Sequence, residues 1–313
     1  MTKQLFINQL TKNQPVNEEL FGINIVKHAL DRNGKPYIDL ELIDKTGTIK
    51  GKIWSDNLPY IDKSQLKEGN VVKITGTINE FNSKLQINIT SLSKTEDFDL
   101  SDFISTTTKN IDLLMQDIQN TIDLIENPNL QNVLNEILQS HKDEIMKSPA
   151  AKSIHHNYIG GLVEHIVEML KISDIVTKLY PEANKDIITA GIILHDIGKI
   201  YELEVNGFQI NYTVKGKLLG HISLGLLLFH EIAKDKLEEK LYTQIEHIIL
   251  SHHYTLEFGS PITPKTLEAV IVAKIDDLSS KARLVQKILK NNEDNDSNFA
   301  PREFGIDGQI YLG

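Results

Sequence analysis

The residues best suited to chemistry in this sequence are His195 and Asp196, which follow a run of apolar residues in the segment IITAGIILHDIGK, residues 187–199. Residues 187–194 are apolar on every side of a helix, so the helix is expected to be buried and the pair to start inside the protein. A buried carboxylate is costly unless it is paired or binds a cation, and a neighbouring imidazole is a good transition-metal ligand. The pair therefore predicts a divalent-metal site.

An isolated pair would be better explained by a capping aspartate and a hydrogen-bonded core histidine. This pair is not isolated, because most of the 11 histidines fall between residues 155 and 253. Five further metal-ligating side chains lie in or at the end of apolar, helix-periodic segments: His165, His221, His252, His253 and Asp276. Their concentration favours a metal centre over a pair of structural residues.

The order of these residues resembles the metal-dependent HD phosphohydrolase superfamily, which is named for its His-Asp doublet. The stretches SPAAKSIHHNYIGGLVEH, HDIGKIYEL and GKLLGHI extend the match, and they resemble the YhaM-type 3′-to-5′ exoribonucleases of Gram-positive bacteria. The resemblance covers nearly the whole chain. It implies hydrolysis of single-stranded RNA to nucleoside 5′-monophosphates, with single-stranded DNA as a further candidate substrate.

The same resemblance implies two divalent ions that share one carboxylate. The first ion is assigned to His165, His195, Asp196 and Asp276. Asp196 bridges to the second ion, which is assigned to His221 and His252, with His253 as the alternative to His252. Asp277 is the alternative to Asp276. The family favours Mn²⁺, although His/Asp sites also accept Fe, Co, Ni or Zn.

Lys199 is a second candidate catalytic residue beside Asp196. It lies three residues after Asp196, on the same side if the helix continues, and there its ammonium can neutralise a phosphate oxygen. If Gly198 ends the helix, the side chain turns away instead. Weaker candidates for contacts with the substrate or the metal are His155, His156, Lys215 and Lys217.

Composition sets the limits for the elements that must position these residues. A chain of 313 residues with 40% hydrophobic residues is long enough for two domains. It contains no cysteine, so the metal ligands must be nitrogen and oxygen. The N-terminus lacks a signal-peptide pattern, and no stretch approaches the ~20 apolar residues of a membrane span. We expect a cytoplasmic protein with no membrane contact.

The sequence of the N-terminal region predicts short strands separated by turns. The strands are expected at residues 20–30, 37–44, 48–54, 71–80 and 85–92. Ile38, Leu40 and Leu42 alternate with polar or amphipathic residues, which gives one buried face and one wet face. The pattern is similar to an OB-fold, a five-stranded barrel that binds single-stranded nucleic acid.

Lys50, Lys52 and Trp54 project together from the third predicted strand, and Tyr37 is a plausible neighbour. Aromatic faces stack bases while lysines contact phosphates, so these four residues are candidates for nucleic-acid binding. The alternative is that Trp54 covers the end of the barrel. The net charge of −10 hides a basic excess in residues 1–94, which hold 13 Lys and Arg against 10 Asp and Glu.

We predict a β domain followed by an all-helical region. The expected parts are a barrel at 1–94, a linker and helical connector at 95–147, an HD domain at 148–290 and a polar C-terminal tail at 291–313. Residues 201–212 alternate and turn at Asn206-Gly207, which predicts a β-hairpin inserted after the HD helix. Phe208 or Tyr212 of this hairpin is a candidate to stack on a terminal base, unless the hairpin is a solvent-exposed decoration.

Two other function classes remain open. A nucleotide or cyclic-dinucleotide phosphohydrolase would use the same metals but has little need of an OB-like domain. A non-enzymatic single-stranded nucleic-acid-binding protein with a structural metal would bind without turnover. The sequence leaves the oligomeric state open.

Overall fold

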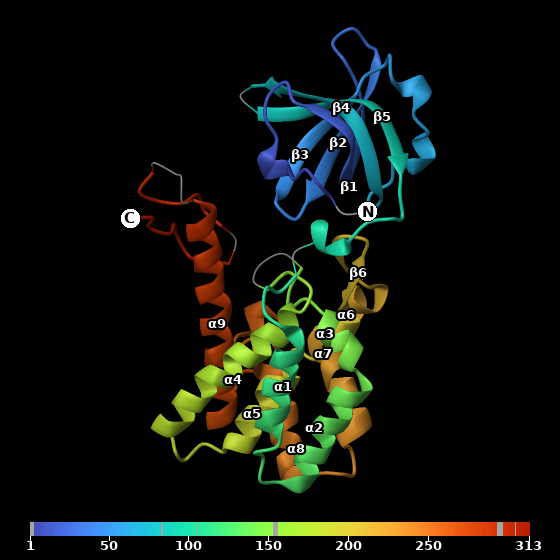
Figure 1. The fold of residues 1–313 in the computed structure, drawn as a ribbon. Coiled ribbons are helices and arrows are strands. Elements are labelled where there is room, and N and C mark those ends of the chain that lie inside the picture. The colour runs from blue at the N-terminus through green and yellow to red at the C-terminus, as the bar shows by residue number, and fades with distance from the viewer. Residues whose placement is uncertain (1–2, 83, 105, 153–155, 293–296, 304) are drawn as a thin grey trace. The chain divides into compact units, whose positions relative to one another are not determined.

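The computed structural model describes residues 3–82, 84–104, 106–152, 156–292, 297–303 and 305–313. The chain divides into two compact units, residues 1–105 with 205–209, and residues 106–204 with 210–313. Figure 1 draws the barrel of the first unit in blue to cyan and the helices of the second in green to red. No helix among the described residues is both long and apolar enough to span a membrane.

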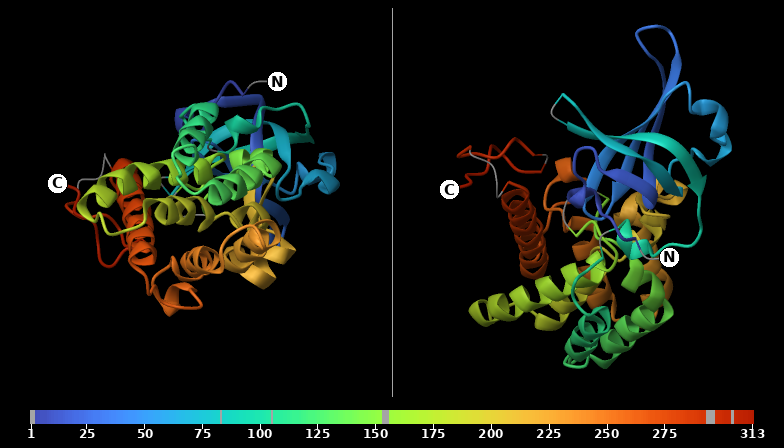
Figure 2. Two further views of the ribbon diagram at one scale, coloured as in Figure 1. Left: turned by 90° about the horizontal axis from the view of Figure 1, so that it is seen from below. Right: turned by 45° about the horizontal axis from the view of Figure 1, so that its top comes forward.

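The first unit is built on a closed five-stranded barrel in the order β1-β2-β3-β5-β4 (Figures 1 and 2). The strands are β1 (Pro15–Leu30), β2 (Pro36–Asp44), β3 (Gly47–Ile53), β4 (Val71–Phe81) and β5 (Lys84–Lys94). Only the β3 and β5 pair is parallel among them, and β1 closes the barrel by pairing with both β2 and β4. Short 3-10 helices lie at Leu58–Tyr60 and Lys63–Gln65, between β3 and β4.

Alternation in the sequence decides which side of each strand faces the barrel core. Ile38, Leu40 and Leu42 of β2 are buried, while the residues between them are partly exposed. In β3 the paired residues Ile49 and Ile53 are buried opposite Leu42 and Ile38. The apolar core therefore fills the barrel and leaves Lys50 and Lys52 on its outer face. The predicted five-stranded OB-fold-like barrel is confirmed.

The second unit is mainly helical, and a hairpin at residues 203–212 interrupts it, with residues 205–209 belonging to the first unit. Its helices are α1 (Ile111–Ile122), α2 (Pro128–Ser140), α3 (Lys142–Lys147), α4 (Gly161–Leu179), α5 (Lys185–Leu194), α6 (Lys199–Glu202), α7 (Val214–Ala233), α8 (Glu239–Ser251) and α9 (Leu267–Asn291). One apolar cluster drawn from most of these helices forms the core. This agrees with the predicted all-helical C-terminal region.

α5 is the central helix of this core. Asn184 caps its start by accepting a hydrogen bond from the Ile187 N–H at 3.2 Å through its side chain, and the helix ends at Leu194, just before His195. Every residue from 187 to 194 is buried, as the all-round apolar pattern predicts. The helix therefore delivers His195 and Asp196 to the protein interior.

The predicted hairpin is present as β6 (Leu203–Asn206) and β7 (Gln209–Tyr212), with Gly207 at φ +60° in the turn. Phe208 is buried, at 4% exposed, and its ring lies 6.2 Å from the ring of Phe103. The suggestion that Phe208 stacks on a base is therefore wrong, because its ring is buried in the protein and packs against Phe103. Tyr212 is 39% exposed, and Lys152 Nζ lies 5.5 Å from its ring centroid.

Part of the segment beyond α9 packs back onto that helix. Ala300 is buried with Leu284 and Ile288 of α9, and Ile310 packs against the same cluster. Hydrogen bonds from Ala300 N–H to Ile310 O at 2.8 Å and from Leu312 N–H to Asn298 O at 2.9 Å pair residues 298–300 with residues 310–312. A small apolar cluster thus covers the end of α9.

Candidate metal centre and nucleic-acid groove

Five elements of the helical unit bring the predicted ligands together. The side chains fall into two groups of closely spaced ligand atoms, one made of His165, His195 and Asp276 and the other of His221, His252 and His253. They come from α4, the end of α5, α7, the end of α8, and α9. Each is buried or half-buried.

The first group lies against one oxygen of Asp196. His165 Nε2 lies 3.1 Å from Asp276 Oδ1 and 4.0 Å from Asp196 Oδ2. His195 Nε2 lies 3.3 Å from the same Asp196 oxygen and 4.0 Å from Asp276 Oδ1. Two imidazoles and two carboxylates thus converge within about the span of one coordination sphere.

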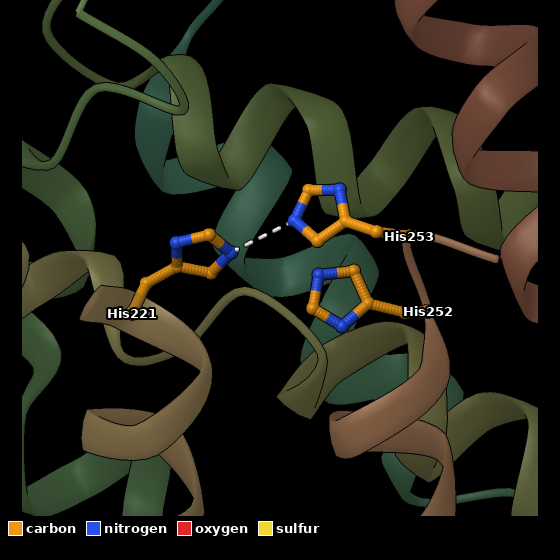
Figure 3. A group of neighbouring side chains, drawn as sticks. All are labelled: His221, His252 and His253. Carbon is orange, nitrogen blue, oxygen red and sulfur yellow. Dashed lines mark hydrogen bonds between the residues drawn. The ribbon is translucent and has the colours of Figure 1, made fainter. Parts of the chain in front are cut away.

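The second group lies against the other oxygen of Asp196. Figure 3 shows the three imidazoles turned toward one another, with His221 Nε2 and His253 Nε2 3.1 Å apart. Asp196 Oδ1 is 3.5 Å from His221 Nε2 and 3.7 Å from His252 Nε2. The carboxylate of Asp196 therefore lies between the two groups, and both His252 and His253 belong to the second one.

Hydrogen bonds on the far side of each ring fix which nitrogen faces the centre. His195 Nδ1 lies 2.8 Å from the Ile192 carbonyl oxygen, and His252 Nδ1 lies 2.8 Å from the Ile249 carbonyl oxygen. A carbonyl oxygen can only accept, so each Nδ1 carries the proton and donates it. Each Nε2 consequently presents its lone pair to the centre, as a metal ligand requires.

Glu202 orients the ring of His221 by accepting hydrogen bonds from it and from its backbone, and the sequence did not point to this residue. Its Oε1 accepts the backbone N–H of His221 at 2.9 Å and lies 3.1 Å from His221 Nδ1. Gly220 makes this double contact possible, because its φ of +70° breaks α7 immediately before His221. The sequence features that could have indicated this contact are the glutamate at the end of HDIGKIYE and the Gly-His pair in KLLGHI.

The charge states at the centre suit a cation. Burial would raise the pKa of Asp196, but the charges of Lys199 and His195 outweigh burial and hold that pKa well below its ordinary value. Burial, with His195 and His253 nearby, pushes the pKa of His252 well below its ordinary value. At neutral pH the carboxylate is therefore ionised and this imidazole is neutral, which are the states that bind metal.

Buried polar atoms without a hydrogen bond test whether a metal fits. Within the described part of the chain, Asp196 Oδ1, His195 Nε2 and His252 Nε2 are buried and have no hydrogen-bond partner. Such atoms are costly unless something else satisfies them. Their chemistry, oxygen and nitrogen without sulfur, suits a divalent transition-metal ion. The residues present fit the metal that the sequence predicts.

Lys199 reaches the centre although α5 does not continue through it. Gly198 is the N-cap of the short helix α6, which begins at Lys199, and Lys199 Nζ lies 2.5 Å from Asp196 Oδ2. A Cβ on Gly198 would lie 2.0 Å from the His221 carbonyl oxygen, so only glycine lets α7 approach this closely. Gly198 thus brings the segment that carries Lys199 against the segment that carries His221.

The remaining sequence candidates lie in different places. His156 packs beside the first group, with its ring 5.5 Å from that of His165, while His155 lies outside the described residues. Lys215 and Lys217 are exposed, and Lys215 Nζ lies 5.5 Å from the Tyr201 ring instead of facing a ligand. Asp277, the alternative to Asp276, pairs with Lys281 at 3.0 Å.

The four barrel candidates form one surface. The rings of Tyr37 and Trp54 lie 5.2 Å apart, and Lys52 Nζ lies 4.6 Å from the first ring and 5.3 Å from the second. Trp54 Nε1 also donates to Asn88 Oδ1 at 3.2 Å. Lys50 and Lys52 line an adjoining groove of about 710 Å³.

The groove contains residues that the sequence analysis did not single out. Phe81, Asn82 and Lys84, at the turn between β4 and β5, line it together with Lys50 and Lys52. Phe81 is 60% exposed, so its ring is open to solvent. An exposed ring among lysines suits a single strand with unstacked bases. No sequence signal paired this turn with β3, because β5 joins β3 only in space.

The comparisons with known proteins define the class. Residues 162–281 match the HD domain family, and residues 22–95 match the OB-fold nucleic acid binding domain family. A solved structure of the second OB-fold domain of replication protein A from Methanococcus maripaludis is 23% identical, covers 31% of this chain and 97% of that one, and gives a TM-score of 0.22. The two family matches place an OB-fold nucleic acid binding domain ahead of an HD domain in this chain.

A curated relative places the chain more narrowly. It is 35% identical over 275 residues to the 3′-5′ exoribonuclease YhaM of Geobacillus sp. strain WCH70, an alignment that covers 86% of this chain and 83% of that protein. The chain belongs to the YhaM family.

Proposed function

We propose that this protein is a metal-dependent 3′-to-5′ exoribonuclease that hydrolyses single-stranded RNA to nucleoside 5′-monophosphates. The observation that carries the proposal is the carboxylate of Asp196 between two groups of metal-ligating side chains. The family relationship supplies the polarity and the preference for RNA. Single-stranded DNA is a second candidate substrate, because phosphate contacts from lysines and base stacking on an aromatic ring need no 2′-hydroxyl.

We assign one ion to His165, His195, Asp196 and Asp276, and a second ion to Asp196, His221, His252 and His253. Mn²⁺ is the metal we favour. When bound, such ions supply an activated water and offset charge on the phosphate that reacts. Lys199, which holds Asp196 Oδ2, adds a positive charge beside that phosphate. The roles of the chain are to fix the ligand nitrogens, exclude bulk water and orient the strand.

The OB-fold domain weighs against the other functions. A nucleotide or cyclic-dinucleotide phosphohydrolase would bind a small substrate at the metal centre alone, and the 710 Å³ barrel groove would have no role. A binding protein with a structural metal would need one closed set of ligands, whereas here the Asp196 carboxylate lies between two groups of metal-ligating side chains. The exoribonuclease uses both features.

The test is incubation of the protein with a 5′-labelled single-stranded RNA, with and without Mn²⁺. We expect metal-dependent shortening from the 3′ end, release of nucleoside 5′-monophosphates, and slowing at a stable duplex. A 3′-phosphate on the RNA should inhibit. Degradation of a circular RNA would show an endonuclease, and shortening from the 5′ end would show the opposite polarity; either result contradicts the proposal.

The barrel groove should determine binding of long RNA. Replacing Lys50 and Lys84 together with alanine removes two phosphate contacts, so we expect long-RNA affinity to fall on the order of tenfold and its salt dependence to weaken. Hydrolysis of a dinucleotide should not change. The matched control is Lys12→Ala, since Lys12 pairs with Glu80 in the same unit. Equal losses on dinucleotide and long RNA would show that the groove is structural.

A further inference from the structure

The chain turns sharply immediately after His252 and His253, the two histidines that follow α8. Tyr254 N–H donates to Ser251 O at 2.9 Å, and Thr255 N–H donates to His253 O at 2.8 Å. Tyr254 has a φ of +68°, in the left-handed region, which a residue with a large side chain rarely adopts. Such strain persists only where the surroundings enforce it, and it gathers at functional sites. Here it adjoins a member of the metal centre.

A lysine from another helix lies over the ring of this tyrosine. Lys274 Nζ is 3.6 Å from the Tyr254 ring centroid, close enough for a cation–π interaction. Lys274 is exposed, belongs to α9 and lies two residues before Asp276. Within the described residues it forms no ion pair with a carboxylate. Its charge is therefore available to an anion from outside the chain.

The segment around Tyr254 is exposed as well as apolar. Tyr254, Leu256 and Phe258 are 36%, 61% and 68% exposed. The Lys274 ammonium covers one face of the Tyr254 ring and leaves the exposed remainder to a ligand. A flat ring and an unpaired ammonium side by side match a base and its phosphate, the two parts of a nucleotide.

We propose that Tyr254 and Lys274 form a binding subsite for one nucleotide of the single-stranded substrate, next to the metal centre. Its base stacks on the Tyr254 ring, and its phosphate contacts the Lys274 ammonium. This inference rests on the proposed function, because a nucleotide is the ligand there. Tyr254 and Lys274 are not among the metal-ligating side chains around Asp196, so we assign them a role in substrate binding only.

The subsite can be tested with a short single-stranded RNA that carries 2-aminopurine at its 3′ end, bound to the full chain with Asp196→Asn to prevent hydrolysis. We expect stacking on Tyr254 to quench the 2-aminopurine fluorescence. Tyr254→Asn removes the ring but tolerates a positive φ, so the fold should survive while quenching is lost and affinity falls about tenfold. Tyr254→Phe should bind as the parent does. Lys274→Gln should lower the salt slope of binding by about 0.7.

Tyr180→Asn is the matched control, because it removes a tyrosine that is 49% exposed at the end of α4. In the otherwise wild-type chain, Tyr254→Asn should raise KM for a dinucleotide and leave metal content unchanged.

Unchanged quenching and affinity in Tyr254→Asn would overturn the subsite, as would loss of metal, which would show a structural role for the turn. A change in self-association by sedimentation, with unaltered RNA affinity, would reassign the surface to protein contact. If the wild-type protein hydrolyses RNA and Tyr254→Asn binds and hydrolyses it equally well, the subsite is rejected but the proposed function stands. A wild-type protein without RNA hydrolysis rejects the proposed function itself.

Discussion

Replacing Asp196 with asparagine is expected to abolish hydrolysis, with a loss of at least roughly 10²- to 10³-fold in kcat. The carboxylate lies 3.3 Å from His195 Nε2 through one oxygen and 3.5 Å from His221 Nε2 through the other. Asparagine keeps the shape but offers one oxygen and no charge, so it cannot serve both groups. Elemental analysis should show reduced metal content, and circular dichroism should show an intact helical fold.

Asp277→Asn is the matched control for this experiment. Asp277 is the neighbour of Asp276 in α9, but its side chain pairs with Lys281 at 3.0 Å and not with a ligand histidine. Its loss should change neither activity nor metal content. Normal metal content and normal activity in Asp196→Asn would reject the assignment of the centre.

Glu202→Ala should weaken metal binding by roughly 10- to 100-fold, the usual effect of losing a residue that orients a ligand. Without the carboxylate, the backbone N–H and the Nδ1 of His221 both lose their acceptor, which lies 2.9 Å and 3.1 Å away. The ring is then free to rotate and to change tautomer. Titration of the metal-free protein with Mn²⁺ by calorimetry measures the effect directly.

Glu202→Gln separates orientation from charge. The amide oxygen still accepts from both donors, so we expect most of the affinity lost in Glu202→Ala to return. Glu204→Ala, an exposed glutamate in β6, controls for the loss of one negative charge nearby. If Glu202→Ala binds Mn²⁺ as tightly as the wild type, the carboxylate does not position His221.

Local patterns predicted the elements well because burial follows periodicity. The alternation of Ile38, Leu40 and Leu42 predicted a strand with one buried face, and the all-round apolar run at 187–194 predicted a buried helix. The hairpin followed from alternation about Asn206-Gly207. In each case the signal and the structure lie within the same few residues.

The sequence did not predict contacts that depend on a break in a helix or on the pairing of strands distant in the chain. Lys215 and Lys217 were weak candidates because they come just before His221 in the sequence, but both are exposed, and Gly220 interrupts α7 between them and His221. The same break creates the Glu202 contact. The part played by Phe81 and Lys84 in the groove depends on the parallel pairing of β3 with β5, which no local pattern encodes.

The ligands at the centre are spread over 112 positions of the chain, from His165 to Asp276, and five separate helical elements carry them. An unfolded chain cannot gather them, so a cation bound there binds only the folded form. Its binding energy is then added to the free energy of unfolding, about 2.7 kcal/mol when the free ion is present at 100 times its dissociation constant. Starving the cell of that ion would therefore shorten the lifetime of the protein as well as stop its reaction.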